Sequence, residues 1–299
     1  MDLMKFENFT KEIVDKVKEF LPEAYADADV RLQLVNKNNG LKLTGLTIRS
    51  IDSNVSPTIY LEKYYEDYVS GEDISEILSK IAKIRVDNEV SNFETDLVTN
   101  FETAKERIIP RLINAEMNKD TLSVRPHKII ADLAVIYTIL LDSDSEGSAS
   151  VTVTNDILKL WGISVDELHE VSISNLKKVQ HTTFKGMSEV MAEMMGINVE
   201  DMGMPEEDKM YVLTNRNKSF GAAVLLDSEM MNHITDRFGS VFVIFSSVHE
   251  ILIILIDENM NVEDLKAMVH EVNETQVTVE ERLSDNVYIY TANNGLLVA

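Results

Sequence analysis

The sequence predicts an α+β fold in which mostly antiparallel sheets carry flanking helices. Short apolar or alternating runs separated by turn residues indicate strands, and apolar residues recurring every three or four positions between those runs indicate helices. The chain has 299 residues, of which 44% are hydrophobic and 26% are charged, so it is long enough for two ordinary domains with buried cores. We expect three consecutive units.

The first unit is expected over residues 1–92. Apolar spacing predicts a helix over residues 6–20, and alternating runs on either side of residues 38–40 (Asn-Asn-Gly) predict a hairpin. The apolar positions change phase after Gly45, which predicts a β-bulge.

Tyr60, Tyr64 and Tyr68 share one stripe of the next predicted helix. Such a stripe favours packing against a sheet, and a partner-binding surface is the alternative.

A second unit is expected over residues 93–205. The apolar run 129–141 predicts one buried strand, which turns through residues 142–147 into a hairpin. Ser164 precedes Glu167 by three positions, as Asp73 precedes Glu76 in the first unit, and both patterns predict the start of a helix.

Methionines cluster in the helix predicted near the end of this second unit. Met187, Met191, Met194 and Met195 lie on one side of it, which favours packing in the core or between domains. The alternative is an adaptable surface, with Met191 and Met195 binding a protein partner or a second copy of the chain.

The third unit is expected over residues 206–299, with an acidic loop at residues 206–208 before it. Here the pattern predicts two β-β-α units in tandem and a final hairpin. Their strands and helices are expected over residues 211–214, 221–226, 228–238, 241–246, 249–256 and 262–272, and the hairpin strands over 287–290 and 296–298.

Composition excludes several classes of function. The net charge of -23 opposes direct binding to nucleic acid or to anionic membranes. With no cysteine, the chain has no disulfide, thiolate metal site, iron–sulfur cluster or cysteine nucleophile.

The N-terminus lacks the apolar core of a secretion signal, and the longest apolar run, residues 251–256, is too short to span a bilayer. We therefore expect a cytoplasmic protein that binds no membrane.

Cofactor motifs are absent from the sequence: it holds neither glycine-rich nucleotide loop, nor a serine elbow, nor a His-Glu-x-x-His run, and we expect no cofactor. The dipeptide His-Glu occurs three times, at His169, His249 and His270. If these imidazoles converged they could bind zinc, but each lacks a second histidine four residues away, which favours separate structural roles.

The segment Ser246-Ser247-Val248-His249-Glu250 brings hydroxyls, an imidazole and a carboxylate together between two apolar strands. Ser246, Ser247, His249 and Glu250, with His270, are the candidate catalytic residues of a hydrolase or metal-dependent enzyme. The alternative is a polar strand connection whose side chains satisfy turn backbone groups.

Several stretches resemble a bacterial family of unknown function whose members have about this length. They span nearly the whole chain and comprise residues 37–49, 56–60, 109–112, 175–176, 194–197, 246–250 and 269–276. The resemblance implies a single recurrent architecture in a bacterial cytosol, and it assigns no activity and no catalytic residue.

The acidic excess and the missing catalytic motifs favour a non-enzymatic protein-interaction module that binds a basic partner protein. A more specific form is a nucleic-acid mimic that inhibits a nucleic-acid-binding enzyme. Two alternatives stay open: the enzyme based on the segment from Ser246 to Glu250, and a homo-oligomer that associates through the methionine-rich helix.

Overall fold

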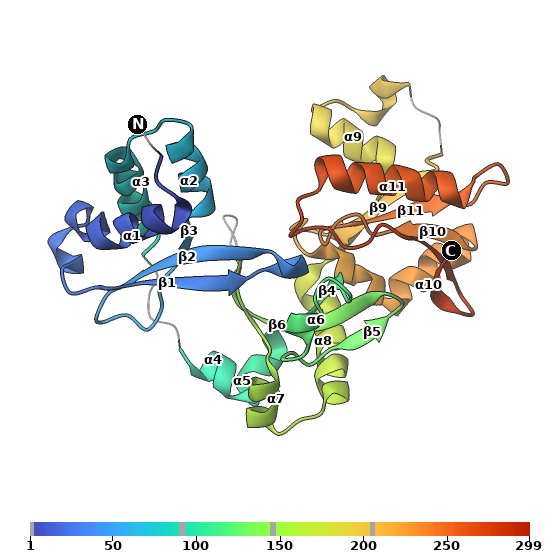
Figure 1. The fold of residues 1–299 in the computed structure, drawn as a ribbon. Coiled ribbons are helices and arrows are strands. Elements are labelled where there is room, and N and C mark those ends of the chain that lie inside the picture. Colours follow the sequence, from blue (N-terminus) through green and yellow to red (C-terminus); the bar gives the residue numbers. More distant parts are fainter. Residues whose placement is uncertain (1–2, 90–93, 144–147, 204–206) are drawn as a thin grey trace. The chain divides into compact units, whose positions relative to one another are not determined.

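The computed structural model describes residues 3–89, 94–143, 148–203 and 207–299, and the chain divides into two compact units, Met1–Thr95 and Asp96–Ala299 (Figure 1). Both units combine helices with antiparallel sheets, so the predicted α+β class is confirmed. Parts of the expected turn 142–147, the residues around 92 and the start of the loop 206–208 lie outside the described residues. Within the described ranges, no helix combines the length and apolarity that a bilayer crossing requires.

The first unit packs three helices against a three-stranded sheet of order β1-β2-β3. Its elements in chain order are α1 (Phe6–Lys16), η1 (Val17–Phe20), η2 (Glu23–Tyr25), β1 (Asp29–Asn36), η3 (Asn38–Gly40), β2 (Lys42–Arg49), β3 (Thr58–Tyr60), α2 (Glu62–Val69) and α3 (Ile74–Asp87). Phe9 and Ile13 of α1, Leu46 and Ile48 of β2 and Ile81 of α3 are buried together. The helix and the hairpin expected from the apolar pattern are confirmed.

The β-bulge expected at Gly45 is wrong. The β1–β2 ladder runs without a shift from the pair Asp29–Arg49 to the pair Asn36–Lys42. A Cβ atom on Gly45 would lie 2.4 Å from Cγ2 of Thr58 in β3. Glycine is therefore explained by the close approach of a third strand, which local sequence does not reveal.

The second unit contains two sheets. The smaller joins strands in the order β4-β6-β5, with β7 also paired to β6, and the larger has the order β13-β12-β10-β11-β9-β8. The strands are β4 (Ile108–Asn114), β5 (Lys128–Ile130), β6 (Leu133–Ser143), β7 (Ser148–Thr152), β8 (Thr182–Gly186), β9 (Met210–Asn215), β10 (Val241–Ile244), β11 (Ile251–Leu255), β12 (Val287–Thr291) and β13 (Gly295–Val298).

Helices connect and cover these strands. They are α4 (Asp96–Thr99), α5 (Phe101–Ala104), η4 (Lys105–Arg107), α6 (Lys119–Leu122), α7 (Asn155–Trp161), α8 (Val165–Gln180), α9 (Met187–Met195), η5 (Val199–Met202), η6 (Gly221–Leu226), α10 (Ser228–Phe238) and α11 (Val262–Gln276). Side chains from both sheets, including Tyr137 of β6 and Val243 of β10, are buried in one cluster.

This shared core contains residues from both sides of the domain boundary that the sequence predicts near residue 205. Phe184 of β8 pairs with Leu213 of β9, so one ladder joins the chain before that position to the chain after it. Asp96–Ala299 is accordingly one compact unit where the sequence suggests two.

Two strand predictions in this unit are wrong. Residues 129–141 form not one strand but two, β5 and β6, because the chain reverses at Ala131, whose φ of 53° lies in the left-handed region. Gly221–Leu226 forms the 3-10 helix η6, so only the second of the two tandem β-β-α units exists, as β10, β11 and α11. A short buried apolar run does not by itself distinguish a strand from a helical turn.

The helix starts and the final hairpin are confirmed. The carboxylate of Asp73 accepts a hydrogen bond from the amide of Ser75 at 2.7 Å, and the hydroxyl of Ser164 accepts one from the amide of Glu167 at 3.1 Å. Both satisfy amides that the first helical turn leaves unpaired. Strands β12 and β13 pair as expected around Gly295.

Candidate functional site

The connection between β10 and β11 holds His249 through its backbone. The amide of His249 donates to Oγ of Ser247 at 2.9 Å, and its carbonyl oxygen accepts from Oγ1 of Thr214 at 2.7 Å. The hydroxyl of Ser247 therefore organises this turn, as the structural alternative to catalysis requires.

Both ring nitrogens of His249 also have partners. The amide of Phe220 lies 3.2 Å from Nδ1, and Oε1 of Glu281 lies 3.3 Å from Nε2. Because a backbone amide can only donate, Nδ1 must be an acceptor, and Nε2 carries the proton that it shares with Glu281. Neither nitrogen contacts a serine hydroxyl, so activation of Ser246 or Ser247 would first have to break one of these bonds.

Phe220 connects His249 to a cation on the neighbouring sheet. Its ring centroid lies 5.5 Å from that of His249, and Cζ of Arg111 lies over the Phe220 ring, 3.8 Å from its centroid. Arg111, Phe220 and Glu281 are the residues that local sequence reasoning misses, because the Arg111–Phe220 contact joins positions 109 residues apart and the His249–Glu281 contact joins positions 32 apart.

Gly221 fits this arrangement closely. A Cβ atom at this position would lie 2.1 Å from Oγ1 of Thr214 and 2.5 Å from the carbonyl oxygen of His249. The turn before η6 therefore packs against β9 and the His249 connection without room for a side chain.

His169 and His270 lie in separate environments. Nδ1 of His169, on α8, lies 3.1 Å from the hydroxyl of Tyr137, and burial together with Lys128 lowers the pKa of this histidine. Nδ1 of His270, on α11, lies 2.9 Å from Oδ2 of Asp285, and the bond to this carboxylate raises the pKa of His270. Helix α11 continues to Gln276, so His270 lies within the helix and not at its end.

In the part of the chain that the structure describes, no three histidine, aspartate or glutamate side chains group in a way that could hold a metal ion. The structure therefore gives the three histidines three different sets of neighbours and no shared centre.

The candidate tyrosines lie in the first unit. Tyr64 and Tyr68 pack partly buried against its core, and the ring of Tyr68 lies 5.4 Å from that of Phe9. Tyr60 ends β3, where Nζ of Lys37 lies 4.6 Å from its ring centroid.

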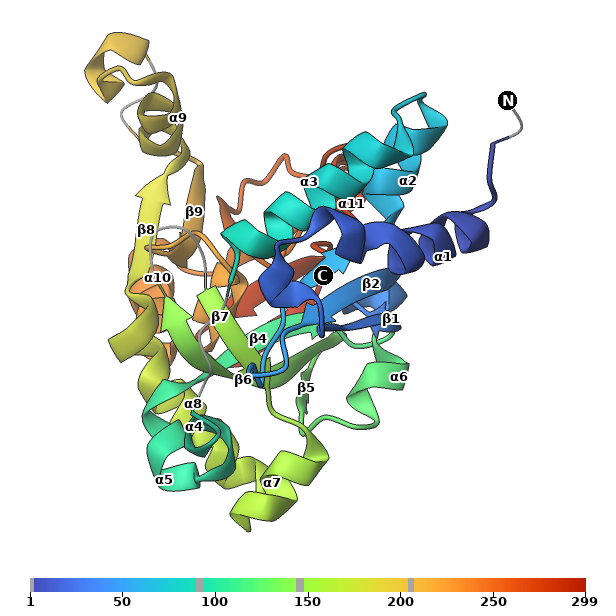
Figure 2. The same cartoon turned by 90° about the vertical axis from the view of Figure 1, so that its left-hand side faces the viewer.

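Met191, Met194 and Met195 of α9 are exposed, so the favoured expectation of core packing is wrong for them, and packing between domains stays a prediction. Figure 2 shows α9 at the far end of β8 and β9, away from the rest of the second unit. We use the name α9 surface for the exposed apolar residues of α9 together with Ile197 and Val199, which follow the helix. The exposed fractions are 39% for Met191, 82% for Met194, 63% for Met195, 42% for Ile197 and 40% for Val199.

Carboxylates flank the α9 surface. Glu189, Glu193, Glu200 and Asp201 lie on α9 and η5. Lys185 of β8 forms ion pairs with Glu189, at 3.0 Å, and with Glu193. The α9 surface is thus apolar with an acidic margin, and local periodicity could not show that these apolar side chains are exposed.

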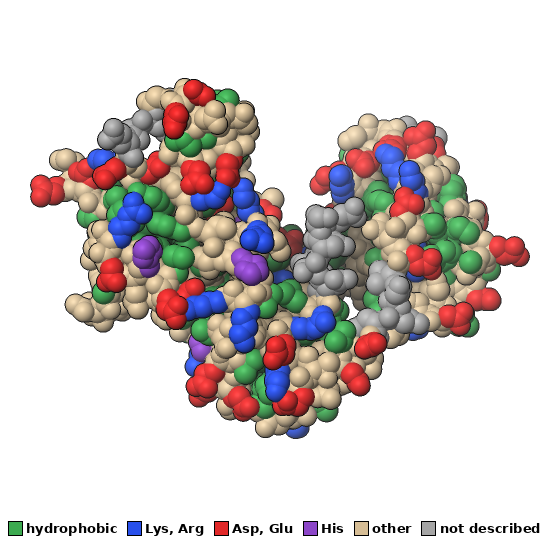
Figure 3. All heavy atoms as spheres, turned by 180° about the vertical axis from the view of Figure 1, so that it is seen from behind, with side chains coloured by type: hydrophobic (Ala, Val, Ile, Leu, Met, Phe, Trp, Pro, Cys, Tyr) green, Lys and Arg blue, Asp and Glu red, His purple; other side chains and the backbone are tan. Residues whose placement is uncertain are grey.

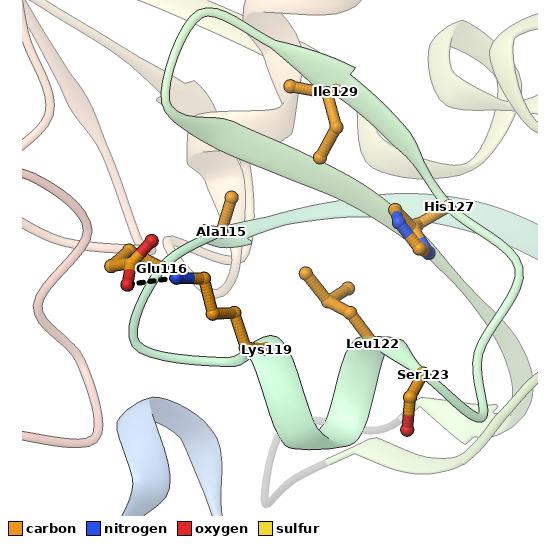
Figure 4. A pocket seen from close by; sticks show the side chains of 7 residues that line it. All are labelled: Ala115, Glu116, Lys119, Leu122, Ser123, His127 and Ile129. Atoms are coloured by element: carbon orange, nitrogen blue, oxygen red, sulfur yellow. Dashed lines mark hydrogen bonds and ion pairs between the residues drawn. The ribbon is translucent and has the colours of Figure 1, made fainter.

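Two cavities add further polar groups. A cavity of about 210 Å³ beneath α9 is lined by Glu250, which is one of the catalytic candidates, together with Lys185 and Arg216. Another, of about 380 Å³, lies beside α6 between Leu122, His127 and Ile129 (Figure 4). There Nδ1 of His127 lies 2.8 Å from the carbonyl oxygen of Arg125 and Lys119 pairs with Glu116, so both charged groups and the imidazole already have partners.

Charge is mixed on the face of the molecule drawn in Figure 3. Acidic and basic side chains are interspersed there over both units. On this face, the excess of carboxylates does not gather into one continuous acidic field.

Comparison with known proteins gives one result. The model of a family of unknown function, DUF5688, matches residues 6–292. No curated protein and no solved structure matches the chain. Because the match covers both units and the His249 connection, the chain belongs to the DUF5688 family, as the full-length resemblance of its sequence predicts.

Proposed function

We propose that this chain is a non-enzymatic protein-interaction module of the cytoplasm and that its α9 surface binds a basic partner protein. The observation that carries this proposal is the exposure of Met194 and Met195, at 82% and 63%. Contiguous exposed apolar side chains cost free energy in water and are typical of binding surfaces.

The chemistry of the α9 surface defines the partner. Methionine side chains are flexible and polarizable, so they adapt to apolar groups of different shape. The acidic margin attracts lysine and arginine, and the net charge of -23 speeds the approach of any cation. An amphipathic helix with apolar residues on one face and basic residues beside them fits both features.

A synthetic peptide tests this proposal. A fluorescent amphipathic peptide of leucine and lysine should bind the protein, with affinity that falls as salt rises from about 50 to 200 mM. The same peptide with glutamate for lysine should not bind. The triple variant Met191→Ser, Met194→Ser, Met195→Ser should weaken binding about tenfold or more.

Met268→Ser provides the matched control, because Met268 is 44% exposed on α11, away from the α9 surface. Equal binding by the triple variant and by wild type would contradict the proposal, as would salt-independent binding. A stable dimer in sedimentation that the triple variant converts to monomer would assign the α9 surface to homo-oligomerisation instead. Nucleic-acid mimicry and the enzyme based on Ser246 to Glu250 stay predictions.

A further inference from the structure

Arg111 is a partly buried cation with no ion pair in the part of the chain that the structure describes. It lies on β4, and its Nη2 atom donates to Oγ of Ser150 at 3.1 Å. Its Nε atom is sealed from solvent and has no hydrogen-bond partner among the described residues. A guanidinium offers five N–H donors in a planar fork, so most of this capacity is unused.

Among the described side chains, hydroxyls are the polar neighbours of Arg111 on its sheet face. Arg111 pairs with Ile136 of β6, which places it on the same face as Thr138, two residues further along β6. Ser150 pairs with Leu140 and shares that face. The hydroxyl of Thr138 is also buried and has no hydrogen-bond partner within the described parts of the chain.

Burial does not remove the charge of Arg111. It lowers the pKa of this guanidinium to about 10, so the group remains a cation at neutral pH. The ring of Phe220 at 3.8 Å stabilises the cation from one side but accepts none of its N–H groups in the plane. A desolvated charge of this kind is normally balanced by an anion that accepts those hydrogens.

We propose that Arg111 anchors a binding site for an oxyanion, the carboxylate or phosphate group of a small ligand, with the hydroxyls of Ser150 and Thr138 beside it. Such a ligand would bind at the β4–β6–β7 face of the second unit, independently of the α9 surface. Through Phe220, whose amide bonds His249, the anion would lie one aromatic ring away from the His249–Glu281 pair.

Thermal unfolding in the presence of added anions tests the site. Sodium phosphate and sodium acetate are titrated separately against sodium chloride at constant ionic strength. We expect one of them to raise the melting temperature of the wild-type protein in a saturable manner, because a ligand that binds only the folded state stabilises it. The anion that saturates at the lower concentration identifies the site as a phosphate or a carboxylate site.

Arg111→Met should abolish this response. In chloride it should melt no lower than wild type, because it removes a desolvated charge that lacks a counter-ion. Arg111→Lys keeps the charge but loses the planar fork and should raise the apparent dissociation constant about fivefold or more. Arg216→Met, which removes an exposed arginine on the turn after β9, is the matched control and should respond as wild type does.

Three outcomes would overturn the proposal. The first is a wild-type protein that neither anion stabilises beyond chloride. The second is an unchanged anion response in Arg111→Met or, if that variant does not fold, in Arg111→Lys. The third is a loss of response in Arg216→Met equal to that in Arg111→Met, which would indicate general screening of charge.

Discussion

Tyr288 donates its phenolic hydrogen to Oδ1 of Asp132, which precedes it by 156 residues and lies in the turn between β5 and β6. The other carboxylate oxygen accepts from Oγ of Ser284 at 3.1 Å and from Nδ2 of Asn286 at 3.0 Å. This single carboxylate therefore ties the smaller sheet of the second unit to the segment that leads into β12. Burial and the bond to Asp132 raise the pKa of Tyr288, so the phenol keeps its hydrogen at neutral pH and donates it.

Loss of this hydroxyl should destabilise the second unit. Tyr288→Phe leaves the Asp132 carboxylate short of one donor and should lower the free energy of unfolding by about 1–3 kcal/mol. Urea denaturation measures this change in the free energy of unfolding. Tyr290→Phe on the same strand is the control, since its side chain is more exposed and should lose less than about 0.5 kcal/mol. Equal losses in the two variants would show that the Asp132 bond contributes nothing.

A side chain at position 221 should be destabilising. Gly221→Ala places a methyl group against Thr214 and the backbone of His249, at separations that require the turn to move, and should cost about 3 kcal/mol. Gly196→Ala is the comparison, because its φ of 68° is strained but the space around it is open, so about 1 kcal/mol is expected. A Gly221→Ala protein as stable as Gly196→Ala would mean that the turn before η6 can shift to accommodate a methyl group at little cost in free energy.

His169 should make stability depend on pH below neutrality. Its pKa is lower in the folded than in the unfolded protein, so the unfolded state binds the proton more readily. The stabilising contribution is present above the unfolded pKa of about 6.5 and is lost as pH falls from there through the lower folded pKa. Urea denaturation at pH values of about 7.5 and 5 should therefore show a larger loss for wild type than for His169→Gln. Equal losses of stability in wild type and His169→Gln would contradict the assignment of this pH dependence to His169.

His270 should show the opposite dependence. Asp285 raises the pKa of His270 in the folded protein. The contribution of His270 to the stability of the fold is therefore complete below the unfolded pKa of about 6.5, and it disappears as pH rises through the folded pKa. Nuclear magnetic resonance titration of the imidazole should give a pKa above that of the same histidine in Asp285→Asn. The pair is exposed, so its effect should weaken at high salt. An identical titration in the two proteins would remove Asp285 as the cause.

The sequence by itself determined the elements whose signals are local. The apolar stripe of α1, the side-chain caps at Asp73 and Ser164, the hairpin of β12 and β13 and the sequence β10-β11-α11 all depend on residues within a few positions of one another. Such patterns predict an element because helix and strand place every third or every second side chain on one face. The α+β class follows from these elements together.

Only the tertiary structure decided where those patterns meet. Residues 221–226 form η6 where Gly221 packs against Thr214 and His249, and Met191, Met194 and Met195 of α9 are exposed. The His249 connection was identifiable from its residues, but its partners Phe220 and Glu281 and the stacked Arg111 were not. Contacts between distant segments depend on how whole sheets pack, and a periodic pattern carries information about the buried face of an element but not about the residue that covers it.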